Sequence, residues 1–235
     1  MVSRLPHEWQ VCREQGPVQG DTDALVELPA GPHEAPEGAS ITRYVTASTT
    51  ESCRILPVLP DRTVVTRPER PLTILPHTEV VLYVGSPVWV RLFSGENETL
   101  GDLPASPPKE AWLGPNTLEG ELCYATRTLG RLRLDEATLR PHRVVTAVSI
   151  RNAVDSPFVC SQVSLPVRQL SVYASDEGRL WTEAVTLERT TTTGFAKLHI
   201  GTKPPAEASH ATLVSGPREQ AEHGNVFRAF GTLFG

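Results

Sequence analysis

The sequence has no long hydrophobic run and no excess of positive charge. No segment approaches the ~20 consecutive apolar residues of a membrane-spanning helix. The formal net charge of −5 gives no basic surface for nucleic acid and no general attraction to an anionic membrane. These absences favour a globular protein that has no transmembrane segment and does not bind nucleic acid.

The common catalytic and metal-binding motifs are also missing. We find no dinucleotide-binding or phosphate-binding glycine loop, no nucleophile-elbow serine motif and no zinc-protease helix motif. No two histidines have metal-ligand spacing, so we predict no metal and no cofactor. Four of the seven histidines follow proline, which predicts that they lie in turns: His7, His33, His77 and His142.

Two features indicate the compartment. The first ten residues have no apolar stretch after Arg4 and do not resemble a signal peptide. The cysteines are far apart and form no C-x-x-C pair, so we expect buried thiols in a reducing environment. We therefore expect a cytoplasmic protein. The cysteines are Cys12, Cys53, Cys123 and Cys160.

Proline is abundant, with 21 residues in a chain of 235, against an average of roughly 5%. The prolines separate short segments that alternate apolar and polar side chains, which is typical of half-buried strands. Since no helical segment lies between these strands to make a crossover, we exclude a parallel sheet and predict an all-β, antiparallel β-sandwich. The clearest predicted strands are 41–46, 62–66, 71–75, 79–84, 88–93 and 143–152.

Two pairs of segments resemble the hairpins of immunoglobulin-like sandwiches. Residues 143–152 are followed by 158–165, and residues 170–174 are followed by 179–187 after a turn at 176–178. We predict two packed immunoglobulin-like β units that divide near residue 130. The predicted parts are an N-terminal unit at 1–130 with its first 40 residues loosely organised, a second unit at 131–219 and an apolar tail at 220–235.

The apolar tail predicts a short C-terminal helix. Its large apolar residues recur at helical spacing, and Asn225 precedes them as an N-cap. The helix could dock on its own core, or it could be an apolar hook for a partner chain or a membrane interface. The residues of the tail concerned are Val226, Phe227, Phe230, Leu233 and Phe234.

Residues 112–128 contain the densest group of chemically active side chains. The Gly114–Asn116 segment indicates a turn. If 118–126 is a strand, Glu119 and Glu121 share one face with Cys123. Such a pair could act in acid–base chemistry or hold a cation, or it could be a solvated face paired with Arg127 or Arg131. The candidate ligand or interface residues here are Trp112, Asn116, Glu119, Glu121, Cys123 and Tyr124.

A second candidate pair lies in an apolar predicted strand. Glu183 faces the same way as Trp181. A carboxylate in such a position forms an interior ion pair with an arginine, or it contacts a ligand. Tryptophan in a β protein is a core or interface residue more often than a sugar-binding one.

Several segments resemble an uncharacterised prokaryotic family, domain of unknown function family 432. The resemblance covers about residues 40–234, and residues 112–124 are its most specific part. The family has no activity to transfer. Its members resemble proteins that are encoded beside small-conductance mechanosensitive channels. The resemblance therefore implies an accessory partner of a membrane channel, located at the inner membrane. The segments that carry the resemblance are 56–76, 87–90, 112–125, 150–152, 165–167 and 180–185.

These observations favour a non-enzymatic accessory or regulatory protein that binds a protein partner. Two alternatives stay open. One is a small-ligand-binding or hydrolytic site around Glu119 and Glu121, which requires that they converge with Arg127 or Glu183 in a concave pocket. The other is a structural subunit of a homo-oligomer, in which the tail packs on a neighbouring copy.

Overall fold

The computed structural model confirms the all-β class, with mainly antiparallel sheets and three short 3-10 helices among the residues that it describes. In this part of the chain, no helix has the length and apolar character needed to cross a membrane. Three of the four cysteines are buried, while Cys53 is half-buried. The described residues are 2–13, 37–46, 52–96, 98–116, 118–137, 142–220, 226–230 and 232–234.

The chain divides into two compact units, Met1–Ile55 with Leu92–Gly101 and Leu56–Arg91 with Asp102–Gly235. Residue 130 lies inside the larger unit. The unit boundaries fall within three strands that form one sheet in the order β4-β8-β9. These strands are β4 (Cys53–Val58), β8 (Trp89–Ser94) and β9 (Glu98–Pro104).

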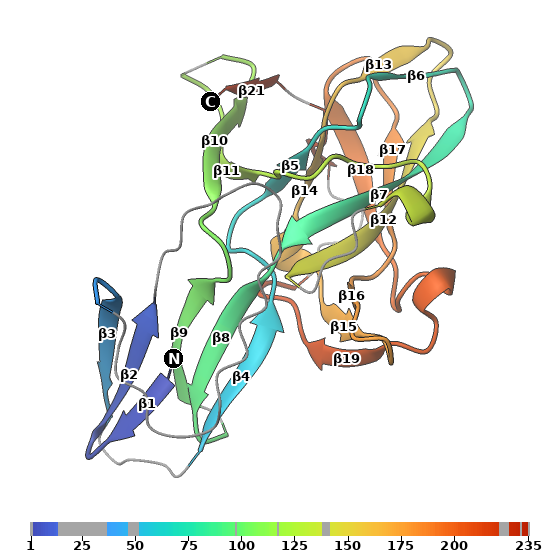
Figure 1. Cartoon of the computed structure of the whole chain (residues 1–235). Coiled ribbons are helices and arrows are strands. Elements are labelled where there is room, and N and C mark those ends of the chain that lie inside the picture. Colours follow the sequence, from blue (N-terminus) through green and yellow to red (C-terminus); the bar gives the residue numbers. More distant parts are fainter. Residues whose placement is uncertain are drawn as a thin grey trace. The chain divides into compact units, whose positions relative to one another are not determined.

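The smaller unit contains an antiparallel sheet of β1 (Val2–Leu5), β2 (Glu8–Arg13) and β3 (Ser40–Val45). The central strand buries Trp9, whose Nε1 donates a hydrogen bond to Ser94 Oγ at 3.2 Å. Regular strands therefore form within the first 13 residues, part of the segment that we predicted to be loosely organised, whereas residues 14–36 lie outside the described part. Figure 1 shows this sheet in blue.

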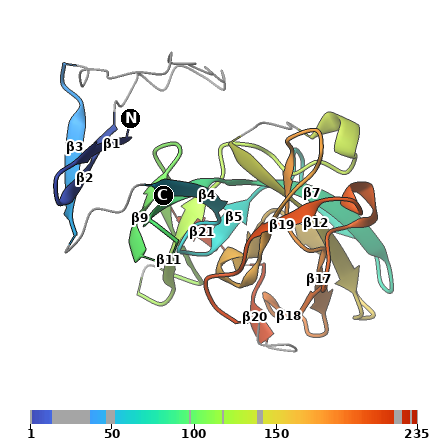
Figure 2. The ribbon, with the colours of Figure 1, turned by 90° about the horizontal axis from the view of Figure 1, so that it is seen from below.

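The larger unit is organised around β12 (Arg143–Asn152), the clearest strand in the sequence. It pairs antiparallel with β7 (Glu79–Pro87) along nearly its whole length, and Figures 1 and 2 show the two strands side by side. Its other edge pairs in parallel with β16 (Leu180–Trp181) and β17 (Val185–Arg189). The exclusion of parallel pairing was wrong, because the chain returns through short strands rather than a helix. The same sheet contains β15 (Val172–Ala174), β18 (Phe195–Ile200), β19 (Thr212–Ser215) and β20 (Val226–Arg228).

A five-stranded sheet shares the main core with the eight-stranded sheet. Val64, Tyr124 and Leu165 of the smaller sheet belong to the same buried cluster as Leu82 and Val148 of the larger one. Two sheets that bury a common set of side chains form the packing expected of a sandwich. The five strands, in spatial order, are β14 (Val163–Leu165), β5 (Val64–Thr66), β11 (Glu121–Ala125), β10 (Lys109–Gly114) and β21 (Thr232–Phe234).

One predicted hairpin is confirmed and the other is wrong. β15 and β16 pair across the turn at 176–178. In contrast, the segment after β12 pairs elsewhere, because β13 (Phe158–Cys160) joins β6 (Leu72–Ile74). The buried amide of Asn152 donates to the carbonyl oxygens of Leu75 at 3.0 Å and Ser156 at 2.9 Å. These bonds direct the chain toward β6 at the end of β12.

The predicted C-terminal helix is also wrong. β20 pairs with β18, and β21 pairs with β10. Phe227 and Phe230 pack against the main core, so tertiary pairing overrides the helical spacing of the apolar residues. A short 3-10 helix, η1 (Leu134–Glu136), precedes β12, and residues 138–141 lie outside the described part.

Candidate functional site

The β10–β11 hairpin fixes its own turn. The side-chain Oδ1 of Asn116 accepts hydrogen bonds from the backbone nitrogens of Leu118 at 2.8 Å and Glu119 at 2.9 Å. Trp112 Nε1 donates to the backbone oxygen of Asn116 at 3.0 Å. An asparagine that bonds the following backbone in this way mimics a turn with its side chain. The predicted turn is therefore present and held by two of the predicted site residues.

Two glycines allow the hairpin to close. A Cβ on Gly114 would lie 2.0 Å from the backbone oxygen of Glu119, and a Cβ on Gly120 would lie 2.4 Å from the backbone oxygen of Leu113. Both distances are far below van der Waals contact, and both neighbours are backbone atoms. The tight approach of the two strands therefore requires residues without side chains at these positions.

The fixed turn presents apolar side chains to solvent. The exposed fraction of Leu118 is 91%, and that of Leu122 is 51%. Leu122 is the register partner of Trp112, which is itself half-buried. We call Trp112, Leu118 and Leu122 the apolar apex of the hairpin. Isolated exposed leucines are common on protein surfaces, but here the backbone that carries them is fixed by hydrogen bonds.

The structure separates the two glutamates of the predicted site. β11 begins at Glu121, so Glu119 lies in the turn. Both are exposed, and Glu121 Oε1 accepts a hydrogen bond from Thr63 Oγ1 at 3.0 Å. Among the described residues, neither forms an ion pair with Arg127 or Arg131, and Arg131 instead pairs with Glu69. The contacts of the described residues therefore link neither carboxylate to the other or to the expected arginines.

Cys123 and Tyr124 point into the protein interior on opposite faces of β11. Cys123 is fully buried, and its Sγ donates to the backbone oxygen of Ala111 at 3.4 Å. Burial, with the nearby charge of Glu121, raises the pKa of the Cys123 thiol to about 11, so it is neutral at neutral pH and no activated nucleophile. Tyr124 belongs to the main core and donates its hydroxyl to Asp61 Oδ1 at 3.0 Å.

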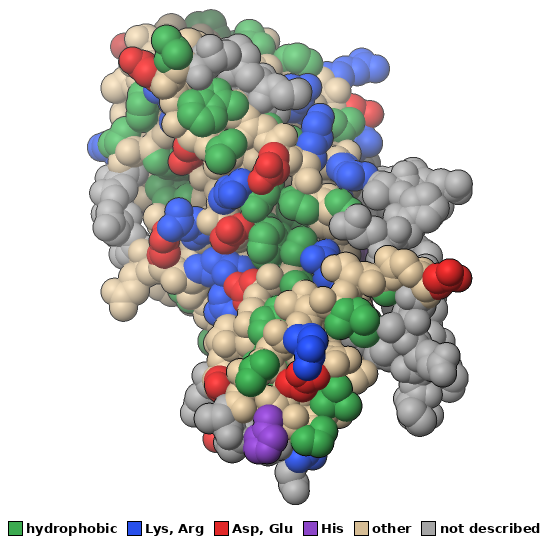
Figure 3. Space-filling view, turned by 90° about the vertical axis from the view of Figure 1, so that its left-hand side faces the viewer, with side chains coloured by type: hydrophobic (Ala, Val, Ile, Leu, Met, Phe, Trp, Pro, Cys, Tyr) green, Lys and Arg blue, Asp and Glu red, His purple; other side chains and the backbone are tan. Residues whose placement is uncertain are grey.

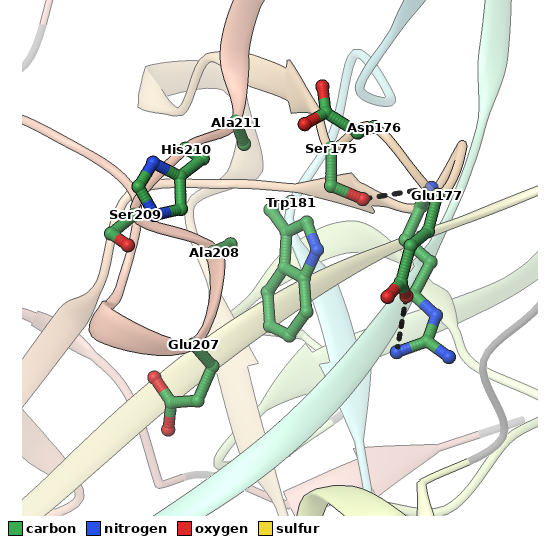
Figure 4. Close-up of a pocket in the computed structure, with 10 residues that line it drawn as sticks. Ser175, Asp176, Glu177, Trp181, Glu207, Ala208, Ser209, His210 and Ala211 are labelled. Atoms are coloured by element: carbon green, nitrogen blue, oxygen red, sulfur yellow. Dashed lines mark hydrogen bonds and ion pairs between the residues drawn. The ribbon is translucent and has the colours of Figure 1, made fainter.

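A separate pocket lies beside the β15–β16 hairpin. It has a volume of about 230 Å³. One wall is the β15–β16 turn, and the other is the segment around the 3-10 helix η3 (Ala206–Ala208). Figure 4 shows Trp181 between these two walls. The polar lining residues used below are Ser175, Asp176, Glu177, Arg179, Glu207 and His210.

The turn that forms the first wall is closed by backbone hydrogen bonds. The Gly178 nitrogen donates to the oxygen of Ser175 at 2.9 Å, and the Ser175 nitrogen donates to the oxygen of Arg179 at 2.9 Å. Gly178 has a φ of +74°, the conformation that favours glycine at this point of a short hairpin loop. Arg179 and Glu177 form an ion pair at 3.2 Å.

The second wall is fixed by a long-range contact. The hydroxyl of Tyr83, on β7, donates a hydrogen bond to Glu207 Oε1. This bond, together with burial, raises the pKa of Tyr83 to about 12. The phenol therefore remains a donor throughout the neutral range, and it holds the Glu207 carboxylate at the pocket.

The structure gives Glu183 partners other than the expected arginine. Its carboxylate accepts hydrogen bonds from the Ser171 nitrogen at 2.9 Å and from the Tyr173 hydroxyl at 3.3 Å. Within the described ranges, no arginine forms an ion pair with this side chain. The predicted ion pair is wrong, because neutral donors from the neighbouring segment, and not an arginine, bind the carboxylate. Trp181, in contrast, lies at the pocket.

Sequence reasoning did not select Glu207, His210 or Tyr83. Tyr83 and Glu207 are 124 residues apart, and no local pattern links them. The only local signal was the turn at 176–178, which was predicted as a turn and not as a pocket wall. The prediction that histidines after proline lie in turns is confirmed for His7 and His77, whose φ angles are 62° and 54°.

One charged cluster in the larger unit is internally compensated. Asp102 pairs with Arg91 at 2.7 Å and also with Arg218. Burial opposes ionisation of Asp102, but the two arginines lower its pKa overall. Figure 3 shows acidic and basic side chains close together on one face. In the described part of the chain, no group of three histidine, cysteine or acidic residues could hold a metal ion.

The fold and these two features define an all-β protein with a rigid apolar hairpin and a small acidic pocket. The chain matches the family described as protein of unknown function (DUF432) over residues 1–234, and it belongs to that family. The match confirms the resemblance and also includes the first 40 residues, which the quoted segments did not cover. Comparisons with curated proteins and with solved structures gave no match.

Proposed function

We propose that the protein is a non-enzymatic accessory protein that binds a protein partner through the apolar apex of the β10–β11 hairpin. The observation that carries this proposal is the 91% exposure of Leu118 on a turn fixed by Asn116. An apolar side chain on a fixed backbone avoids the cost of ordering the loop on binding. The apex therefore has the character of a preorganised contact, on a hairpin that also carries the paired Trp112 and Leu122.

The family resemblance supplies the finer proposal about the partner. It implies a membrane channel of the small-conductance mechanosensitive type, and hence a location in the cytoplasm at the periphery of the inner membrane. The tail is a weaker contact than the hairpin. Phe227 and Phe230 pack against the protein's own core, while Val226 is 58% exposed, and the side chains of Leu233 and Phe234 lie outside the described part.

Co-purification from the native host tests the proposal. Tagged protein is recovered from membrane and soluble fractions, and retained proteins are identified by mass spectrometry. We expect the wild type to retain a partner that the double variant Leu118→Asp, Leu122→Asp loses. The matched control is Leu213→Asp, because Leu213 is 60% exposed on β19 and should retain the partner.

The outcomes separate the alternatives. Equal retention by the wild type and the hairpin variant would contradict a role for the apex. Retention of a channel subunit in the membrane fraction would support the finer proposal, and retention of a soluble protein alone would contradict it. Light scattering on the same variants tests the homo-oligomer, which would dissociate in the hairpin variant if the partner were a second copy.

A further inference from the structure

Both glutamates of the β10–β11 hairpin lie beside the apolar apex. Glu119 directly follows Leu118, so their Cα atoms are about 3.8 Å apart. The indole ring of Trp112 lies against Gly120, since a Cβ at this glycine would be 2.8 Å from Trp112 Nε1. Gly120 stands between Glu119 and Glu121 in the chain. The two residues next to the indole contact are therefore both acidic.

The negative charge at this end of the hairpin is uncompensated. Glu119 and Glu121 are exposed, and in the described ranges neither side chain forms an ion pair. Residues 110–126 contain no lysine or arginine. The guanidinium group of Arg62, which comes from the segment before β5, pairs with Glu110 at 2.7 Å. The exposed apolar side chains thus stand next to two free carboxylates.

The charges decide which class of partner fits the apolar apex. A second copy docked apex to apex on a twofold axis would bring like carboxylates together, because such an interface pairs the same surface of both copies. An anionic membrane surface would repel the same groups. A partner surface with lysine or arginine around an apolar pocket supplies complementary charges. An apolar centre with a charged edge is also the usual arrangement of core and rim in a protein interface.

We propose that the apex docks into an apolar pocket of a partner protein whose edge is lined by lysine or arginine, with Leu118 in the pocket and Glu119 and Glu121 against the basic edge. The inference rests on the proposed function, because it names the chemistry of the partner for the same hairpin. The two carboxylates steer the encounter and fix the orientation, whereas Leu118 and Trp112 supply the apolar contact. This recognition role requires no convergence of the two carboxylates on one atom.

Binding in extracts of the native host tests the proposal on the full-length chain. Purified protein is immobilised at equal density and incubated with the soluble fraction or the detergent-solubilised membrane fraction. Mass spectrometry quantifies the protein whose retention is lost in Leu118→Asp, and this protein serves as the probe. We expect the double variant Glu119→Gln, Glu121→Gln to lower its retention about fivefold, since each exposed charge contact is worth roughly 1.5- to 5-fold. Charge reversal to lysine at both positions should lower it further.

Two comparisons separate the local charges from the net charge and from the apolar contact. The double variant Asp155→Asn, Asp176→Asn removes the same number of charges from two exposed positions outside the hairpin, and it should leave retention unchanged. Raising the salt concentration from ~0.1 to ~1 M shortens the Debye length from ~10 to ~3 Å. The higher salt should therefore lower retention by the wild type more than retention by the glutamine variant. A purely apolar contact has no charge to screen.

The outcomes distinguish this inference from the function on which it rests. If no protein depends on Leu118, the proposed function fails and the inference fails with it. If a protein depends on Leu118 but is retained equally by the glutamine and lysine variants at both salt concentrations, the function stands and the basic-edged pocket is wrong. Leu118-dependent binding to phosphatidylcholine vesicles with about 30% phosphatidylglycerol, or a Leu118-dependent dimer in light scattering, would also overturn it. Equal midpoints of thermal unfolding show that the variants remain folded.

Discussion

The β10–β11 hairpin and the Trp181 pocket are built in opposite ways. The hairpin lies within residues 109–125, and its turn is closed by Asn116 and by the absence of side chains at Gly114 and Gly120. The pocket combines residues 175–181 with 207–211, and Tyr83 reaches Glu207 across 124 residues. The hairpin is thus a local structure, and the pocket exists only in the folded chain.

The two regions also differ in what a substitution should change. A side chain added at Gly114 or Gly120 would clash with backbone atoms of the hairpin, so such a substitution should lower the free energy of unfolding. The charged side chains of the pocket are exposed and contribute little to stability. The comparison predicts large stability effects at the turn of the hairpin and small ones at the pocket.

Matched glycine substitutions test this contrast most strongly. Gly114→Ala should lower the free energy of unfolding by about 3 kcal/mol or more, because its Cβ meets backbone. Gly178→Ala, in the pocket turn, meets nothing within 4 Å but has a φ of +74°, and it should lose about 1 kcal/mol. Denaturant unfolding measures both, with Gly216→Ala as the unstrained control. Equal losses of unfolding free energy in the Gly114 and Gly178 variants would contradict the expected difference between the hairpin and the pocket.

Asn116→Ala tests the turn through its hydrogen bonds. Two backbone N–H groups lose their acceptor, and water replaces it in part, so we expect a loss of about 1–2 kcal/mol in unfolding free energy. Asn116→Asp keeps an oxygen acceptor and should lose less. Thermal unfolding of the two variants shows which one is less stable. A greater loss of stability for Asn116→Asp than for Asn116→Ala would contradict the role of the side-chain oxygen as acceptor.

Tyr83→Phe tests the long-range contact of the pocket. The bond to Glu207 is exposed, so we expect a loss of only about 0.5 kcal/mol at neutral pH. Because folding raises the pKa of the phenol from 10.0 to about 12, its contribution is complete below pH 10 and disappears as the pH rises through 12. Unfolding at several pH values measures the difference between variant and wild type. A difference that grows above pH 10 would have the wrong sign.

Leu118→Asp should give the smallest stability change, within about 0.5 kcal/mol, because the side chain is 91% exposed. Denaturant unfolding checks this directly. The same variant tests the proposed function cleanly only if its stability is unchanged. A large loss would show that Leu118 supports the fold rather than a partner contact.

The comparison also explains which features the sequence could predict. The strand at 143–152 and the turns at 114–116 and 176–178 depend on nearby residues, and all three are present. The partners of the strands depend on the whole chain. The parallel pairs of β12 and the two C-terminal strands in place of a helix therefore could not be derived from periodicity.

The same limit applies to the candidate sites. The sequence indicated the residues of the hairpin because they are contiguous, but it could not show that Glu119 and Glu121 separate at the start of β11. Nor could it show that Glu183 accepts from Ser171 and Tyr173. The pocket was missed apart from Trp181, since its walls meet only through tertiary contacts.

Site-specific photo-crosslinking in the native host tests the central claim most directly. A photoreactive phenylalanine analogue replaces Leu118 at the apolar apex, or Leu213, which is 60% exposed, as the control. We predict a discrete cross-linked partner from position 118 that is absent from position 213 and is lost when Leu122→Asp is added. No cross-link from position 118, or the same product from both positions, would contradict binding through the hairpin.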